Sequence, residues 1–184
     1  MSEEELVVLL DDDGREIGTA PKSSVHGTDT ALHLAFSCHV LNDAGQVLVT
    51  RRALDKRTWP GVWSNSFCGH PRPAEPLLAA VRRRAEYEIG LTLTDIELSL
   101  PLFRYRAVDA SGIVEHEICP VYTARASGEP VLNALEVAEA RWVAPEDLAR
   151  ALDATPWAFS PWLVLQAEQM RVFDALSSTA RGAT

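Results

Sequence analysis

The sequence predicts an α/β (α+β) protein, a sandwich of mixed β-sheets flanked by helices. Strand-like segments separated by turn signals occur on both sides of one long amphipathic helix, and further helical segments follow the last strand. The length of 184 residues and a hydrophobic content of 47% suit one domain with a substantial core. We therefore expect a single domain over residues 1–184, with its core at about 30–168.

The first part of the chain is expected to form two β-hairpins. An apolar run at 6–10 precedes an Asp-Asp-Asp-Gly turn, after which 15–19 can return as a second strand. Residues 20–30 are polar and contain a proline and a glycine, which predicts a loop. The second hairpin pairs a strand at 32–41 with a strand at 46–51, across an Asn-Asp-Ala-Gly turn.

The rest of the chain alternates between breakers, a helix, strands and further helices. Residues 53–73 contain five prolines and glycines, too many for a regular element. A helix is expected at 75–89, with Gly90 as its C-terminal stop. The remaining elements are short strands at 96–100, 102–108, 113–124 and 141–143, a helix opening at 144–148, a last helix at 157–175, and a disordered tail at about 177–184.

Charge and composition exclude several classes of partner. The net charge of −9 argues against a nucleic-acid or membrane-surface role. No run approaches the ~20 apolar residues that a membrane span requires. The acidic start lacks the basic region of a signal peptide, and three cysteines without paired spacing favour free thiols in a reducing cytoplasm.

Two short runs carry the residue types of a chemical site. In the first, Cys68 lies two residues from His70. In the second, Glu115 and Glu117 occupy alternate positions, so on a strand both point to one face. A buried structural thiol and a solvated strand face are the alternatives. Apolar neighbours of the two glutamates favour a buried setting, where carboxylates need partners or a cation.

A third pattern is similar to a Nudix box, a loop–helix–loop motif whose carboxylates hold divalent cations against a diphosphate. The matching positions are Gly69, Glu75, Arg83 and Gly90. Of the last three acids of that motif only Glu88 is present, because Arg84 and Tyr87 stand at the other two positions. A hydrolase needs those carboxylates to bind metals and activate water. The pattern therefore indicates a protein that grips a diphosphate without hydrolysing it.

With these motifs, the chain resembles the type 1 isopentenyl diphosphate isomerases, a family with the Nudix fold. The resemblance spans about residues 7–166 and rests on the segments 32–37, 50–54, 59–63, 65–71, 103–107 and 155–162. It implies interconversion of isopentenyl and dimethylallyl diphosphate, hence a small isoprenoid diphosphate as the partner. A monomer or weak homodimer is expected. A Nudix pyrophosphohydrolase and a non-catalytic diphosphate-binding relative are the rival interpretations.

The resemblance also implies roles for individual residues. Cys68 and Glu117 would transfer the protons, Tyr105 would lie beside the acid, and Trp162 would face the hydrocarbon end of the substrate. From the sequence alone, a core position is equally natural for both aromatic residues. Cys38 and Cys119 are expected to be buried thiols without a role.

Two kinds of metal ion are implied. Three histidines and two glutamates, with Cys68 close by, would surround one Mn²⁺ or Zn²⁺, or Mg²⁺ as the less favoured ion; they are His26, His33, His70, Glu115 and Glu117. Glu88 would bind a Mg²⁺ carried in with the diphosphate. The basic residues that would meet the phosphates are Lys22, Arg52, Lys56 and Arg84. His39 and His116 have no counterpart in this pattern.

Overall fold

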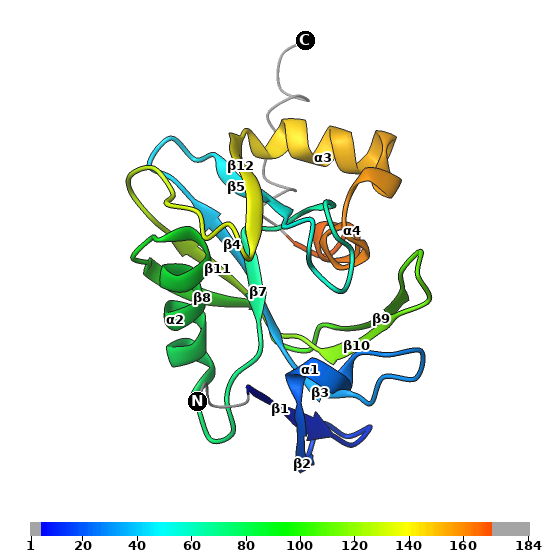
Figure 1. Cartoon of the computed structure of the whole chain (residues 1–184). Helices are drawn as coiled ribbons and strands as arrows, with labels where there is room; N and C mark the ends of the chain where they lie inside the picture. The colour runs from blue at the N-terminus through cyan, green and yellow to red at the C-terminus, as the bar shows by residue number, and fades with distance from the viewer. Residues whose placement is uncertain (1–4, 171–184) are drawn as a thin grey trace.

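The computed structural model describes residues 5–170, and within them the strands form two mixed sheets (Figure 1). The first has the order β2-β1-β3-β10-β9 and consists of β1 (Leu6–Leu10), β2 (Glu16–Pro21), β3 (His33–Leu34), β9 (Arg104–Val108) and β10 (Val114–Ile118). The second has the order β12-β5-β4-β11-β8, from β4 (Phe36–Leu41), β5 (Val47–Arg52), β8 (Thr94–Leu100), β11 (Val121–Arg125) and β12 (Val137–Val143). Two short strands, β6 (Trp63–Ser64) and β7 (Phe67–Gly69), pair with β5 and β4. The predicted mixed-sheet architecture is confirmed.

Two neighbouring segments of the chain, paired in parallel, both pass from the first sheet into the second. Strand β3 pairs with β10 in the first sheet, and their continuations β4 and β11 pair in the second. The change occurs at Ala35 on one strand and at Cys119–Pro120 on its neighbour, where Pro120 has no backbone N–H to continue the ladder. The predictions of unbroken strands at 32–41 and 113–124 were therefore wrong, because each segment is two strands in different sheets.

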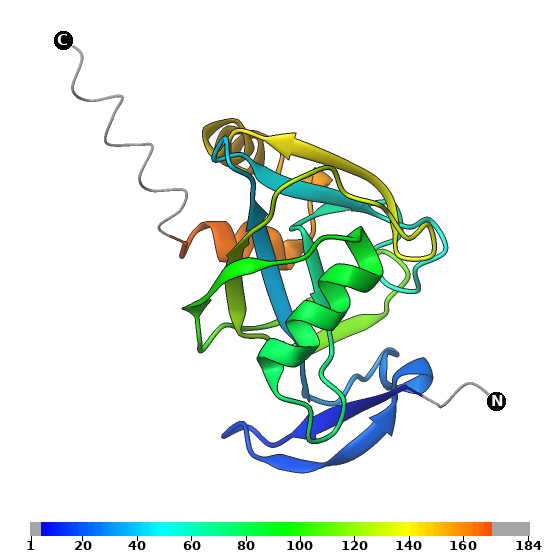
Figure 2. The same cartoon turned by 90° about the vertical axis from the view of Figure 1, so that its left-hand side faces the viewer.

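The seven-stranded sheet is covered on both faces by helices. Along β4, Phe36, Cys38 and Val40 belong to a core under α2 (Leu77–Ile89), which lies across one face of the sheet (Figure 2). The intervening side chains point to the opposite face, as strand alternation requires. That face packs against α3 (Pro145–Ala154) and α4 (Pro161–Ala167) through a second core that includes Leu148 and Leu163.

Helix α2 and its end follow the sequence closely. Its buried side chains recur at helical spacing, and Gly90 closes the helix in the left-handed conformation, at φ 64°. The helix begins at Leu77, two residues later than expected. Beyond it, the backbone N–H groups of Val131 and Asn133 donate to the carbonyls of Ile89 and Glu88 at 2.8 and 3.0 Å. A later loop thus satisfies carbonyls that a helix end leaves unpaired.

Other expectations were met or corrected. The turn at 109–112 joins β9 and β10, and the first hairpin forms as expected. In the second, β4 and β5 pair only beside the turn, at Leu41 and Val47, while β4 otherwise pairs with β7 and β11. The supposed loop at 20–30 contains a short helix, α1 (Lys22–Val25), and the breaker-rich stretch 53–73 contains β6 and β7. These elements are too short for a sequence pattern to reveal.

The last predicted helix is divided. A 3₁₀ turn, η1 (Pro156–Ala158), precedes α4, and Phe159 and Ser160 separate them. Pro161 is the first residue of α4, because proline begins a helix more readily than it continues one. The expected helical residues 171–175 and the expected disordered tail lie outside the described residues. Among residues 5–170, no helix is long and apolar enough to cross a membrane.

We predict that Gly90→Ala is more destabilising than Gly45→Ala. Both glycines have positive φ, so alanine at either position costs about 1–2 kcal/mol in backbone strain. A Cβ at Gly90 would also lie 2.8 Å from the Val131 side chain and 2.9 Å from its carbonyl oxygen, whereas nothing lies within 4 Å at Gly45. Overpacking typically costs a further ~1–3 kcal/mol. Urea unfolding of the two variants measures the difference; equal losses of stability would contradict the tight approach of Val131.

Candidate active site

One cavity of about 500 Å³ gathers most of the predicted site residues. Its walls include all the predicted proton-transfer, aromatic and phosphate-binding side chains, namely Cys68, Glu117, Tyr105, Trp162, Lys22, Arg52, Lys56 and Arg84, with the predicted metal ligands His26, His70 and Glu115. Two predicted residues do not line it: His33 lies fully buried behind the other histidines, and Glu88 is buried against Arg84. Residues far apart in the sequence therefore meet in one place.

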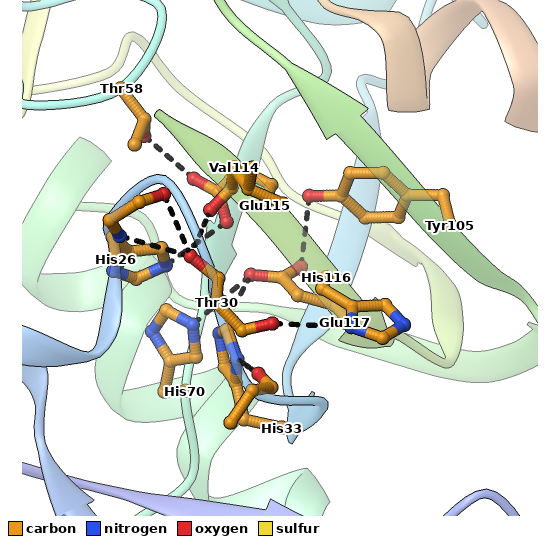
Figure 3. Close-up of polar contacts among 12 residues, drawn as sticks. His26, Thr30, His33, Thr58, His70, Tyr105, Val114, Glu115, His116 and Glu117 are labelled. Atoms are coloured by element: carbon orange, nitrogen blue, oxygen red, sulfur yellow. Dashed lines mark hydrogen bonds and ion pairs between the residues drawn. The ribbon is translucent and has the colours of Figure 1, made fainter. Parts of the chain in front are cut away.

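Strand register places three of these side chains in one row. Across β9, β10 and β3, Tyr105 is paired with Glu117 and Glu117 with His33. The Tyr105 hydroxyl donates to Glu117 Oε2 at 3.0 Å, and Nε2 of His70 lies 3.2 Å from Glu117 Oε1 (Figure 3). Glu115 lies two residues earlier on the same face of β10. The same-face prediction for the two glutamates is thereby supported by their contacts.

The histidines and Glu117 form a cluster compatible with a metal ion. Ligand atoms of His26, His33, His70 and Glu117 lie within 4.8 Å of one another. His33 Nδ1 hydrogen-bonds the Ala31 carbonyl at 2.8 Å, so Nδ1 carries the proton and the Nε2 lone pair points at the cluster. Among the described residues, no group makes a hydrogen bond to that buried Nε2. A divalent ion would satisfy it.

Glu115 lies at the margin of this cluster. Its Oε2 contacts His26 Nε2 at 3.1 Å, while its Oε1 accepts a 2.6 Å hydrogen bond from the Thr58 hydroxyl. Thr58 was not predicted, and a single threonine in a loop carries no signal that could have identified it. His116 lies between the two glutamates but turns to the Thr30 carbonyl at 3.3 Å, so its exclusion agrees with the structure (Figure 3).

Burial and partners shift the protonation equilibria of the site. Burial alone would raise the pKa of Glu117, but the His33 and His70 imidazoles beside its carboxylate hold that pKa well below its usual value. Burial lowers the pKa of His70 to about 4, which leaves a neutral imidazole at neutral pH. An ionised carboxylate and a neutral imidazole are the forms that bind metals.

Cys68 lines the same cavity and is carried by β7. Its Sγ is 3.3 Å from the Ser37 hydroxyl and 3.3 Å from Asn65 Oδ1. Burial raises the pKa of the thiol to about 11, so Cys68 is protonated at neutral pH. Cys38 and Cys119 are buried in the two cores, as expected of thiols without a role. The cavity is thus lined by both a neutral thiol and an ionised carboxylate.

The aromatic residues form the apolar part of the cavity. The rings of Tyr105 and Trp162 are 5.7 Å apart, and Trp59 meets Trp162 edge-on at 5.4 Å. The Arg52 guanidinium lies 5.3 Å from the centroid of the Trp162 ring, an arrangement typical of a cation–π contact. The ring face of Trp162 is therefore presented to positive charge.

Most of the predicted phosphate-binding cations already have carboxylate partners. Lys22 pairs with Glu5 at 2.8 Å, and Lys56 pairs with Glu136. Arg84 pairs with both Glu88 and Glu136, and all three side chains are largely shielded from solvent. Arg52 instead donates to the carbonyl and hydroxyl oxygens of Thr58. Glu5 and Glu136 were not predicted, because nothing in their sequence surroundings distinguishes them from surface acids.

Comparisons with known proteins agree on the family. A model of the NUDIX domain matches residues 31–163. An isopentenyl-diphosphate Delta-isomerase of Agromyces mediolanus is 71% identical over 167 residues, covering 91% of this chain and 81% of that protein. One of Paenarthrobacter aurescens is 57% identical over 176 residues, covering 96% of each chain.

Solved structures share the fold at lower identity. A MutT NUDIX hydrolase of Burkholderia pseudomallei has a TM-score of 0.58 at 27% identity, over 75% of this chain and 97% of that one. A Deinococcus radiodurans crystal structure has a TM-score of 0.63 at 20% identity, over 82% of this chain and 90% of that one. The latter likeness supports the fold alone.

The cluster should retain one divalent metal ion per chain through dialysis, and His70→Ala should release it. Removing a partner outside the ligand shell costs ~10–100-fold in metal affinity, and loss of a ligand should exceed this. His116→Ala is the matched control, because His116 flanks the same glutamates but faces away. Elemental analysis measures the bound metal, and thermal unfolding with and without chelator measures its stabilisation. Equal metal content in the two variants would contradict the ligand assignment.

Proposed function

This chain belongs to the Nudix family and, within it, to the isopentenyl-diphosphate Delta-isomerases, and we propose that Cys68 and Glu117 perform the proton transfers of that reaction. The enzyme interconverts isopentenyl and dimethylallyl diphosphate in isoprenoid biosynthesis. The single observation that carries the residue assignment is the cavity itself, whose walls bring the thiol, the carboxylate, two aromatic rings and four cations together.

Moving the double bond requires two proton-transfer groups. Protonating an unactivated alkene forms a tertiary carbocation, and removing a proton from a neighbouring carbon completes the isomerisation. Cys68, from the seven-stranded sheet, and Glu117, from the five-stranded sheet, reach the cavity from different walls. Their opposite protonation states at neutral pH suit one donor and one acceptor. In the reverse reaction the two exchange roles.

The resident metal is proposed to be Mn²⁺ or Zn²⁺, held by His26, His33, His70, Glu115 and Glu117. Nitrogen ligands favour these borderline ions over Mg²⁺. When bound, the ion supplies positive charge that orients Glu117 and tunes its acidity. A separate Mg²⁺ is proposed to enter with the diphosphate and to use Glu88.

The cations and aromatic rings are assigned to opposite ends of the substrate. Lys22, Arg52, Lys56 and Arg84 anchor the diphosphate, since charge-assisted contacts to phosphate oxygens are strong. Trp162, 2% exposed, faces the carbocation and helps exclude the water that would quench it. Tyr105 donates to Glu117 and fixes its carboxylate.

The structure also bears on the rival hydrolase. Glu88, the remaining acid of that part of the Nudix box, is hydrogen-bonded by the neighbouring Arg84 side chain. Tyr87 is 47% exposed and lies under the Arg84 guanidinium rather than adding a carboxylate. This helix face therefore lacks the several acids that metal-assisted attack by water requires.

Cellular location and assembly remain predictions. All three cysteines are free, which is consistent with the proposed reducing cytoplasm. We propose a monomer or weak homodimer that acts on a free small molecule and uses neither nucleic acid nor a membrane as a partner.

Cys68→Ala should lower turnover of isopentenyl diphosphate by ~10²–10⁴-fold, the usual contribution of a proton-transfer group. Cys38→Ala is the matched control, because Cys38 is also buried but packs under α2. Products are separated by chromatography after incubation with Mg²⁺, and circular dichroism checks that both variants fold.

Near-normal turnover by Cys68→Ala would contradict its role. The same samples serve to test the hydrolase interpretation. Release of phosphate from nucleoside or sugar diphosphates at a rate comparable with isomerisation would revive that interpretation.

Trp162→Leu and Lys56→Gln should affect different kinetic constants. A desolvated cation–π contact of about 2 kcal/mol corresponds to roughly a thirtyfold loss of kcat for Trp162→Leu. Lys56→Gln should mainly raise KM, because a phosphate contact is similar in ground and transition states. Steady-state kinetics of both variants make the comparison. A raised KM with intact kcat in Trp162→Leu would contradict the cation-stabilising role and show that Trp162 only shapes the pocket.

A further inference from the structure

We propose that Asn65 is a positioning residue that holds the Cys68 thiol and the Trp162 indole in one fixed arrangement. The inference rests on the proposed function, in which these two side chains act on the substrate. Asn65 itself does not line the cavity. It is fully buried beneath the wall that carries Cys68.

The orientation of the Asn65 amide is determined by its nitrogen. Nδ2 donates to the Cys38 carbonyl at 3.1 Å and to the Phe67 carbonyl at 2.7 Å. Turning the amide over would place its oxygen against two carbonyl oxygens inside the protein, which burial makes costly. The side-chain oxygen of Asn65 can therefore point only toward the opposite side.

On that side, one oxygen atom accepts hydrogen bonds from both proposed catalytic groups. Asn65 Oδ1 lies 3.0 Å from Trp162 Nε1 and 3.3 Å from Cys68 Sγ, and it also accepts from the Ser64 hydroxyl at 2.9 Å. Trp162 comes from α4, and Cys68 comes from β7. The indole N–H also lies 3.0 Å from Ser64 Oγ, but Asn65 Oδ1 is the acceptor that the indole shares with the thiol, and it links two side chains from different elements.

A second connection holds the other side of the thiol. Gln166, one turn after Trp162 on α4, donates from Nε2 to the Ser37 hydroxyl at 2.9 Å, and Ser37 Oγ lies 3.3 Å from Cys68 Sγ. Helix α4 is therefore tied to both sides of the thiol, through Asn65 and through Ser37. Asn65 Oδ1, which carries no hydrogen, can only accept from the Cys68 thiol, whereas the Ser37 hydroxyl can either donate to it or accept from it.

The neighbouring Ser66 separates positioning from simple structural support. Ser66 is also fully buried and joins two strands, accepting from the Val40 backbone N–H at 2.7 Å and donating to the Leu48 carbonyl at 2.7 Å. It has no contact with Cys68 or Trp162 among its hydrogen bonds. If buried polar bonds in this run served stability alone, Asn65→Ala and Ser66→Ala would behave alike.

The experiment compares steady-state kinetics and thermal unfolding of wild type, Asn65→Ala and Ser66→Ala, at a temperature where all are folded. Asn65→Ala should lower kcat by ~10²-fold with little change in KM, the scale of loss seen when reacting groups are misplaced by about 1 Å. Ser66→Ala should lower the unfolding temperature and leave kcat near wild type. If Asn65→Ala does not fold, Asn65→Asp replaces it and is judged by the same criterion, since a carboxylate cannot donate to the two carbonyls.

A double-mutant cycle with Trp162→Phe tests whether Asn65 affects kcat through its hydrogen bond to the Trp162 indole. Phenylalanine keeps an aromatic ring but removes the indole N–H, so Asn65→Ala should cost less kcat in that background than in wild type. Equal losses in both backgrounds, or a kcat for the Asn65 variant as high as that of Ser66→Ala, would overturn the proposal. If wild type itself fails to isomerise the substrate, the proposed function fails instead, so the two failures are distinguishable.

Discussion

The arrangement depends on two neighbouring strands that change sheets together. Parallel pairing between β3 and β10 continues as pairing between β4 and β11, and Ala35 and Pro120 mark the change. Before the change, the strands carry His33, Glu115 and Glu117; after it, β4 carries Ser37 beside the thiol of β7. Residues of both sheets therefore line one cavity. The metal-compatible cluster takes His33 and Glu117 from the five-stranded sheet, whereas His70 follows β7 of the other sheet, two residues after the thiol.

Burial of charge is the second constraint on this region. Two glutamates on one face of β10 are 5–6% exposed, which would be unfavourable without compensation. Glu117 is compensated by Tyr105 and two histidines, and Glu115 by Thr58 and His26. Since burial lowers the pKa of His70 and keeps that imidazole neutral, a divalent ion would complete the charge balance more effectively than a proton on His70. The same residues thus serve electrostatic stability and chemistry.

The sequence predicted what depends on composition and spacing. The helix ending at Gly90, the first hairpin and the mixed-sheet class are determined by local signals, and the candidate site residues were predicted from family motifs. The strand breaks at Ala35 and Pro120 were missed, because an apolar run reads the same whether it stays in one sheet or crosses to another. Thr58, Glu136 and Asn65 were missed for a related reason. Their importance lies in partners brought close by the fold, such as Glu115, Lys56 and Trp162, and no spacing along the chain encodes those contacts.

The carboxylates paired with Lys22, Lys56 and Arg84 bear on how ligands arrive and leave. With Glu5, Glu88 and Glu136 already in place, these three cations present little uncompensated positive charge to solution. A stray monovalent anion would have to displace a carboxylate for little gain. Under the proposed function, a diphosphate that arrives with its own divalent counter-ion would instead exchange partners, with the cations binding phosphate oxygens and the carboxylates binding the metal.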